Sequence, residues 1–258
     1  MTVLYDSPIF GPIHSRRLGV SLGINLLPGD GKCCSFDCIY CECGFNKDFV
    51  PHGKFASPQS VHDALKAQLE NMRQNGPRPD VLTFAGNGEP TMNPWFPEIV
   101  GDVISLRNEY FPSAKVSVLS NATQILRQEV FDALQIVDNN ILKLDTVSDD
   151  YIRLLDRPVS PHYKAADIIS KMAQFHGHCI VQTMFLRGEY DGKDVSNVSD
   201  DFVLPWIEAL QTIRPAEAMV YTIDRETPAH GLKKASHEEL DEIARKVEAA
   251  GIKCQVSY

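Results

Sequence analysis

The residues that most clearly point to chemistry are cysteines, five of which lie between Cys33 and Cys43. Among these, Cys34, Cys38 and Cys41 have the spacing C-x-x-x-C-x-x-C. Three thiolates on one short loop can bind three irons of a [4Fe-4S] cluster and leave the fourth iron without a protein ligand. A small molecule that carries an amine and a carboxylate can chelate that open iron and receive an electron from the cluster.

Two other uses of these cysteines stay open at this point. A structural zinc site uses clustered thiolates but needs four ligands, and Cys43 would then be the fourth, at an unusual spacing. A disulfide requires an oxidising compartment. We predict that Cys33 and Cys43 are not ligands, and that the isolated Cys179 and Cys254 are ordinary buried side chains.

A glycine-rich turn, Gly86-Asn87-Gly88-Glu89-Pro90, follows an apolar run that has the character of a strand. Glycine allows the backbone to approach a ligand closely and to present bare amide and carbonyl groups. The turn is therefore a candidate for holding a cofactor. A plain strand-ending turn is the alternative.

Polar residues also occur at the ends of three later candidate strands. Asn121 can offer amide hydrogen bonds, Asp145 can accept one from a hydroxyl, and Gln182 is polar among apolar neighbours. The alternatives are a turn residue for Asn121 and a helix N-cap for Asp145. The sequence assigns no catalytic residue.

Candidate groups for contacting a substrate are charged or titratable and flank the predicted sheet. His14 and Arg16 precede the first predicted strand, and Asp224 and Arg225 follow the last. Asp224 and Arg225 can equally form a surface ion pair.

The elements that must position these residues alternate between short β-branched or apolar runs and longer runs with helical periodicity. The predicted strands are Val20–Leu26, Val81–Ala85, Lys115–Leu119, Ile141–Asp145, Cys179–Phe185 and Ala218–Ile223. The predicted helices are Ser57–Asn75, Trp95–Tyr110, Arg127–Leu134, Lys164–Phe175, Asp201–Ile213 and Ser236–Ala250. This order predicts an α/β fold with parallel strands, an open, partial (β/α)6 barrel of the TIM type. In such folds the site lies at the carboxyl ends of the strands.

We expect one domain over residues 1–258. Residues 1–30 form an N-terminal extension with the first strand, 31–235 the core, and 236–258 a C-terminal helix and tail. The first residues do not resemble a signal peptide, and no apolar run approaches the ~18 residues needed to span a bilayer. We therefore expect a cytoplasmic protein without a membrane partner. The net charge of −9 disfavours a nucleic-acid partner without excluding one.

The cysteine spacing, with Tyr40 directly before Cys41, resembles the signature of the radical S-adenosylmethionine superfamily. The resemblance implies a [4Fe-4S] cluster and S-adenosylmethionine, which is cleaved reductively to a 5′-deoxyadenosyl radical that abstracts hydrogen from a substrate. It also implies an electron donor such as flavodoxin or ferredoxin. Tyr40 would pack beside the adenine, and residues 86–90 resemble the Gly-Gly-Glu-Pro motif that binds the cofactor's amino group. Asn121 and Asp145 match positions that contact its carboxylate and ribose.

Over residues 9–230 the chain resembles the compact subgroup related to the tRNA wyosine-synthesising radical enzymes. Those enzymes carry a second cluster, and no second cysteine triad is visible here. With the negative charge, this favours a small-molecule substrate, for example a nucleobase-like heterocycle. The alternatives are a tRNA-modifying radical enzyme and a zinc-stabilised binding protein without catalysis.

Overall fold

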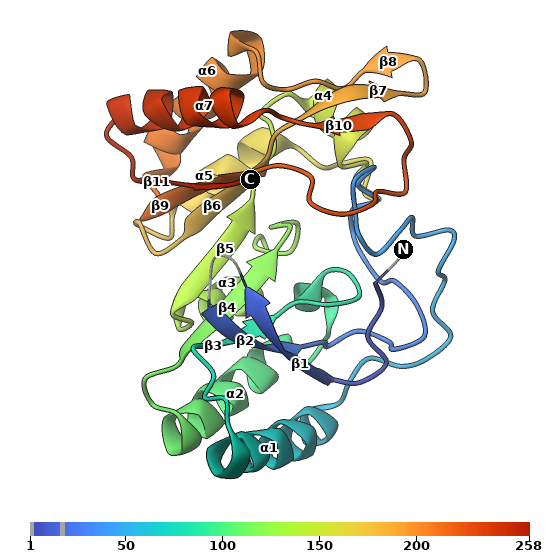
Figure 1. Cartoon of the computed structure of the whole chain (residues 1–258), viewed down its shortest axis with the longest axis vertical. Helices are drawn as coiled ribbons and strands as arrows, with labels where there is room; N and C mark the ends of the chain where they lie inside the picture. Colours follow the sequence, from blue (N-terminus) through green and yellow to red (C-terminus); the bar gives the residue numbers. More distant parts are fainter. Residues whose placement is uncertain (1–2, 16–18) are drawn as a thin grey trace.

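The computed structural model describes residues 3–15 and 19–258, so the substrate candidate Arg16 lies outside the described residues. One large sheet forms the centre of the described chain, and Figure 1 shows its strands fanning from β1 to β11 without closing. In spatial order its strands are β1 (Ile9–Ser15), β2 (Gly19–Ile24), β3 (Val81–Phe84), β4 (Lys115–Ser120), β5 (Asn139–Lys143), β6 (Ile180–Met184), β9 (Glu217–Tyr221) and β11 (Cys254–Ser257). The predicted open, partial α/β barrel is confirmed.

Helices cover the outer face of this sheet (Figure 1). They are α1 (Pro58–Asn75), α2 (Phe96–Tyr110), α3 (Gln128–Gln135), α4 (Asp149–Leu155), α5 (Ala165–Ala173), α6 (Asp200–Ile213) and α7 (His237–Ala249), with a 3-10 turn, η1, at Pro90–Met92. Local chemistry sets the bounds of α1, because the side chain of Ser57 accepts a hydrogen bond from the Ser60 amide and Pro58 occupies the first helical position.

The six predicted strands correspond to the parallel strands β2, β3, β4, β5, β6 and β9. The structure adds two edge strands that the sequence analysis did not predict. β1 pairs antiparallel with β2, and its Gly11-Pro12 step hid it from a search for strand-like runs. β11 pairs parallel with β9 after the turn at Gly251, so the end of the chain is a strand and the predicted tail is wrong there.

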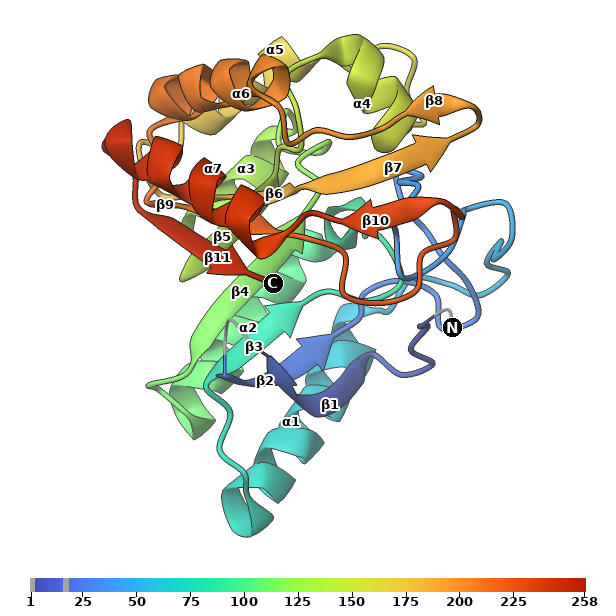
Figure 2. The ribbon, with the colours of Figure 1, turned by 45° about the horizontal axis from the view of Figure 1, so that its top comes forward.

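A second, small antiparallel sheet lies above the carboxyl ends of the main strands (Figure 2). Its strands are β10 (Leu232–Lys234), β7 (Leu186–Tyr190) and β8 (Lys193–Asp194), in that spatial order. The hydroxyl of Tyr151 on α4 donates to the Val195 carbonyl at 2.6 Å and ties this sheet to the helix layer. The sequence analysis predicted neither this sheet nor α4.

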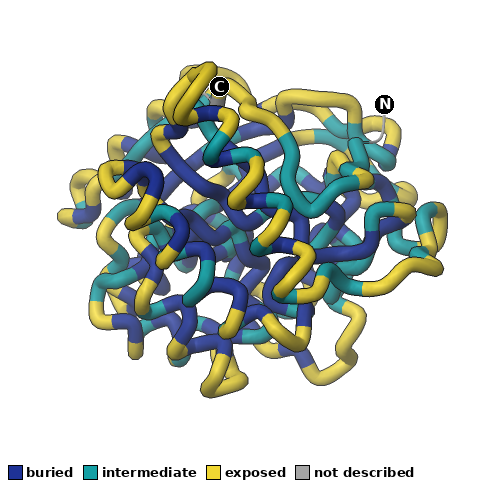
Figure 3. Tube along the Cα trace, turned by 90° about the horizontal axis from the view of Figure 1, so that it is seen from below, coloured by how far each residue is buried: buried dark blue, intermediate teal, exposed yellow. Residues whose placement is uncertain are grey.

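The buried residues form one hydrophobic cluster, and Figure 3 shows buried segments in dark blue through the middle of the molecule. Their largest members include Trp206, Phe84 and Phe96, each at most 1% exposed. Among the described residues, no helix is both long enough and apolar enough to cross a membrane. The apolar packing thus fixes the sheet as a rigid frame whose carboxyl edge carries the loops described below.

The attachment of β1 depends on a glycine, because the Phe10 ring occupies the space above Gly23, its partner across the strand pair. A Cβ on Gly23 would lie 2.1 Å from that ring. We expect Gly23→Ala to displace Phe10 and to lower the free energy of unfolding by ~1–3 kcal/mol, measured by urea denaturation. Gly101→Ala on α2 is the matched control; a Cβ there meets no atom within 4 Å, so this change should stabilise the protein by ~1 kcal/mol. Equal stability of both variants would contradict the assigned packing.

Candidate active site at the carboxyl ends of the strands

The three motif cysteines lie on a long loop, residues 25–56, between β2 and α1; we call it the cysteine loop. Backbone contacts hold it to the end of α4, where the amides of Asp37 and Ile39 donate to the carbonyls of Asp156 and Leu155 at 2.9 and 3.0 Å. Cys34, Cys38 and Cys41 are all free thiols. Cys38 is buried, and the other two are partly exposed. The three motif cysteines are therefore unoxidised sulfur donors on one loop.

The start of the cysteine loop is joined to the glycine-rich turn by a parallel β-bridge between Cys33 and Gly88. The Cys33 amide donates to the Asn87 carbonyl at 2.8 Å, and the Glu89 amide donates to the Cys33 carbonyl at 3.0 Å. A Cβ on Gly88 would lie 2.0 Å from the Cys33 carbonyl oxygen, and Gly88 has φ +133°. Glycine is therefore required here for the contact and for the backbone conformation.

Asn87, which separates the two glycines, has a side chain that is fully buried and occupied by the protein itself. Its Oδ1 accepts from the Tyr5 amide at 2.8 Å, and its Nδ2 donates to the carbonyls of Tyr5 and Pro28 at 2.8 and 2.9 Å. This residue thus ties the N-terminal segment to the glycine-rich turn. These contacts give a structural reason for the asparagine that separates the two glycines, where the similar motif has Gly-Gly.

Glu89 is 2% exposed and joins the ends of β3 and β4. Its Oε1 accepts from the Thr91 amide at 3.1 Å and the Ser120 hydroxyl at 2.9 Å, and from the Thr91 hydroxyl. Its Oε2 accepts from the Asn121 amide at 2.6 Å and keeps further acceptor capacity. Burial raises the pKa of the Glu89 carboxyl, while the hydrogen bonds from Thr91 and Asn121 oppose that rise.

Asn121 reaches from the end of β4 to the cysteine loop. Its Nδ2 donates to the Ser35 hydroxyl at 2.9 Å and lies 3.5 Å from the Cys34 sulfur. Its Oδ1 accepts from the Thr123 amide at 3.0 Å, which holds the amide plane in this orientation. The structure thus brings this predicted residue beside a predicted ligand.

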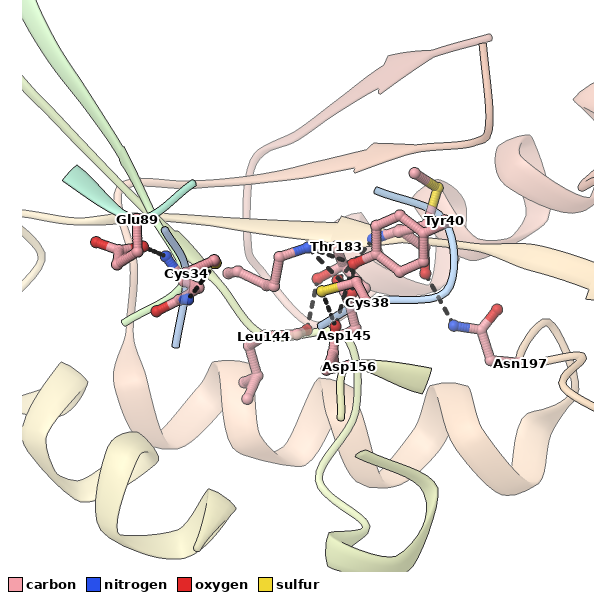
Figure 4. A network of polar contacts seen from close by, with 12 residues as sticks. Cys34, Cys38, Tyr40, Glu89, Leu144, Asp145, Asp156, Thr183 and Asn197 are labelled. Carbon is pink, nitrogen blue, oxygen red and sulfur yellow. Dashed lines mark hydrogen bonds and ion pairs between the residues drawn. The ribbon is translucent and has the colours of Figure 1, made fainter. Parts of the chain in front are cut away.

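A buried polar network surrounds Cys38, and Figure 4 shows it converging from four parts of the chain. The Tyr40 hydroxyl donates to Asp145, lies 3.2 Å from Asp156 Oδ1, and accepts from the Lys143 ammonium. The Cys38 thiol donates to Asp156 Oδ1 at 3.3 Å. Asp145 Oδ1 accepts from the Met184 amide at 2.9 Å, which links the network to β6. Tyr40 and Asp145, both predicted site residues, are therefore direct partners.

Sequence reasoning missed Asp156 and Lys143 as members of this network. Burial and the nearby Asp145 raise the pKa of the Asp156 carboxyl, and its Oδ2 is buried without a partner among the described residues. Burial alone would lower the pKa of Lys143, but Asp145 and its other neighbours outweigh that effect and raise it. Lys143 could have been predicted as a site residue, because it precedes Asp145 in the Lys-Leu-Asp run at the end of β5. No local sequence pattern indicates Asp156.

A cavity of about 260 Å³ lies inside the open barrel, beside the cysteine loop. It is lined by residues of β1, β2, β3, β4, β5, β6 and β9 and by the segment after β9. Of the sequence-predicted residues, Gln182, His14, Asp224 and Arg225 all line it. Arg225 also pairs with Glu42, next to Cys41, at 2.6 Å. One cofactor candidate and three substrate candidates are thereby brought to a single space.

The donor set fits an iron–sulfur cluster held by three thiolates. Three cysteine thiols on one loop can bind three irons of such a cluster and leave the fourth iron without a protein ligand. The buried ammonium of Lys32 lies in the same loop; burial lowers its pKa, but the electrostatic effects of Cys41, Cys34, Cys38 and Asp37 outweigh this and raise it. A resident positive charge suits thiolate ligands.

Comparison with known proteins identifies the class. Residues 30–200, about two thirds of the chain, match the radical SAM superfamily, so the chain belongs to this superfamily. The enzymes of this superfamily use a [4Fe-4S] cluster and S-adenosylmethionine.

The chain is similar in sequence to proteins of several bacteria. The chain is 29% identical over 234 residues to a UPF0026 protein of Helicobacter pylori, a match that covers 90% of this chain and 71% of that protein. It is 28% identical over 244 residues to a protein of Brachyspira hyodysenteriae named GTPase Obg, covering 93% of this chain but only 33% of that protein. The chain thus spans about a third of the length of the latter relative.

Solved structures confirm the fold. A radical SAM methyltransferase from Sphaerobacter thermophilus superposes with a TM-score of 0.68 at 16% identity, covering 92% of this chain and 66% of that one. The wyosine-synthesising enzyme TYW1, solved with a lysine-pyruvate adduct, gives 0.62 at 14% identity over 89% and 73% of the two chains. At these identities the likeness concerns architecture.

The bridge between Cys33 and Gly88 makes a direct prediction about cluster binding. Gly88→Ala places a methyl group against a backbone carbonyl, so we expect a loss of ~1–3 kcal/mol of stability from the strained conformation alone, together with a lower iron content after anaerobic reconstitution. Gly192→Ala is the matched control: it also has positive φ, +71°, but a Cβ there meets no atom within 4 Å. Full iron loading of Gly88→Ala would show that the bridge does not position the thiols.

Proposed function

We propose that this protein is a radical enzyme that binds its [4Fe-4S] cluster through Cys34, Cys38 and Cys41, cleaves S-adenosylmethionine, and abstracts hydrogen from a small-molecule substrate in the barrel cavity. The observation that carries the proposal is the placement of the cysteine loop. The loop is bridged to the glycine-rich turn at Gly88 and lies at the carboxyl ends of the parallel strands. Superfamily membership supports the radical chemistry.

The cluster, when bound, supplies the electron that cleaves the cofactor to a 5′-deoxyadenosyl radical. The chain's own residues have distinct tasks around it. Residues 86–90 present a turn whose Glu89 carboxylate retains acceptor capacity for an ammonium group. Asn121 fixes the loop beside Cys34, and the buried hydroxyl of Tyr40 is fixed by Asp145. Gln182 offers an amide inside the cavity, where it can orient a bound heterocycle.

The small-molecule assignment has support in the shape and charge of the cavity. Its inner wall includes the apolar side chains of Leu119, Ile141 and Met219, and its charged groups include Asp224 and Arg225. Such a space suits a compact molecule with an apolar or flat body and a polar end. The net charge of −9 gives no long-range attraction to an RNA backbone. An electron donor such as flavodoxin or ferredoxin completes the proposed reaction.

Removal of one ligand tests the cluster assignment. We expect the reconstituted protein to hold about four irons and four sulfides per chain, and Cys34→Ala to lose most of the iron and the broad visible absorbance. Reduced wild-type protein incubated with S-adenosylmethionine should release 5′-deoxyadenosine, and Cys34→Ala should not. Cys254→Ala, which removes a thiol on β11 at the far edge of the sheet, is the control and should match wild type. One tightly held zinc and no iron uptake would refute the proposal.

Substitution at the cavity separates substrate binding from cofactor cleavage. When the wild-type protein is incubated with a deuterated metabolite extract, we expect deuterium from the substrate to appear in 5′-deoxyadenosine. We expect Arg225→Ala to reduce this transfer by ~10–100-fold, the loss of one hydrogen bond to a charged group, with the slow substrate-independent cleavage unchanged. Arg78→Ala is the matched control, because it removes the same charge from an exposed segment before β3. It should leave the deuterium transfer unchanged. Transfer stimulated by bulk tRNA and not by the extract would favour the tRNA-modifying alternative.

A further inference from the structure

The cysteine loop contains a buried cation that the sequence analysis did not single out. The side chain of Lys32 is 0% exposed. Its Nζ donates to the Gly44 carbonyl at 2.6 Å and lies 3.7 Å from Asp37 Oδ1. Taking an ammonium group out of water costs several kcal/mol unless anionic partners compensate. The nature of those partners indicates what the lysine does.

Asp37 compensates the charge of Lys32 only weakly, because its carboxylate oxygens also bind other groups. Its Oδ1 accepts from the Asn46 amide at 2.7 Å, and its Oδ2 pairs with Arg157 at 3.3 Å. With the looser contact at 3.7 Å, this carboxylate is shared between Lys32 and Arg157. One carboxylate cannot neutralise two cations, so Asp37 compensates the buried charge of Lys32 only in part.

The contacts of Lys32 connect two parts of the loop that carry the motif cysteines. Gly44 is tied to the third motif cysteine, since its amide donates to the Cys41 carbonyl at 2.9 Å. Asp37 lies between the other two, Cys34 and Cys38, in the sequence. The Lys32 ammonium thus bridges the segment after Cys41 and the segment between Cys34 and Cys38, and its charge interacts with all three sulfurs.

We propose that Lys32 is a positioning residue for the cluster, whose fixed positive charge offsets the negative charge of a cubane bound by three thiolates and raises its reduction potential. This inference rests on the proposed cluster ligands. Reduction adds a negative charge to the cluster, and a buried cation stabilises the reduced form more than the oxidised form. Burial makes the effect strong, because water does not screen the charge.

The test is an electron-paramagnetic-resonance redox titration of reconstituted protein, wild type against Lys32→Met, which keeps the length of the side chain and removes its charge. We expect the midpoint potential of Lys32→Met to be more negative than that of wild type. Lys47→Met removes the same charge from an exposed position of the same loop, where water screens it, and should leave the potential unchanged. Iron content and circular dichroism are measured on every sample.

A third variant, Lys32→Arg, covers the case in which Lys32→Met folds but does not hold iron. If Lys32→Arg then retains the cluster, the charge is needed for retention and the proposal stands. A wild-type potential in loaded Lys32→Met overturns it. Loss of iron from both folded variants also overturns it, because the requirement would then be for the shape of lysine. Failure of the wild-type protein itself to take up iron would instead refute the cluster assignment.

Discussion

The close backbone contact between Cys33 and Gly88 is the constraint on which the rest of the site depends. The cysteine loop has no regular secondary structure of its own around the motif, so the sheet must locate it. This isolated bridge does so by holding Cys33 against the turn that follows β3, which needs a residue without a side chain at position 88. The next residue, Glu89, then ties the same turn to β4 through Ser120 and the Asn121 amide.

Buried charge is the second organising feature, and it occurs in two groups of residues. In one, Lys32 is an ammonium with a shared carboxylate partner. In the other, Lys143 contacts the Tyr40 hydroxyl and Asp145, and Asp156 contacts Cys38. Groups of this kind are costly to bury, and a protein retains them where charge must be balanced or oriented. Their concentration around three thiols agrees with a site that handles charge.

Local patterns were enough to predict the frame and the residues at its carboxyl edge. Alternating apolar runs give the strands β2 to β6 and β9, and polar residues that follow strands give Glu89, Asn121 and Asp145, because parallel strands end at one edge. The rest depends on contacts between distant positions. Asp156 meets Cys38 across 118 residues of sequence, and Lys32 becomes recognisable only through its burial. The sequence did not predict β1, because a Gly-Pro step interrupts its strand pattern, or β11, because it is short.

The edge strand β1 completes the wall of the cavity where the open barrel lacks further parallel strands. It supplies Phe10, Ile13 and His14 to the wall of the cavity, at the side where parallel strands are lacking. On the opposite side the segment after β9 supplies Arg225, which pairs with Glu42 at 2.6 Å. Glu42 is bonded directly to Cys41. Because Glu42 and Arg225 both line the cavity, the segment after β9 and the cysteine loop meet at its wall.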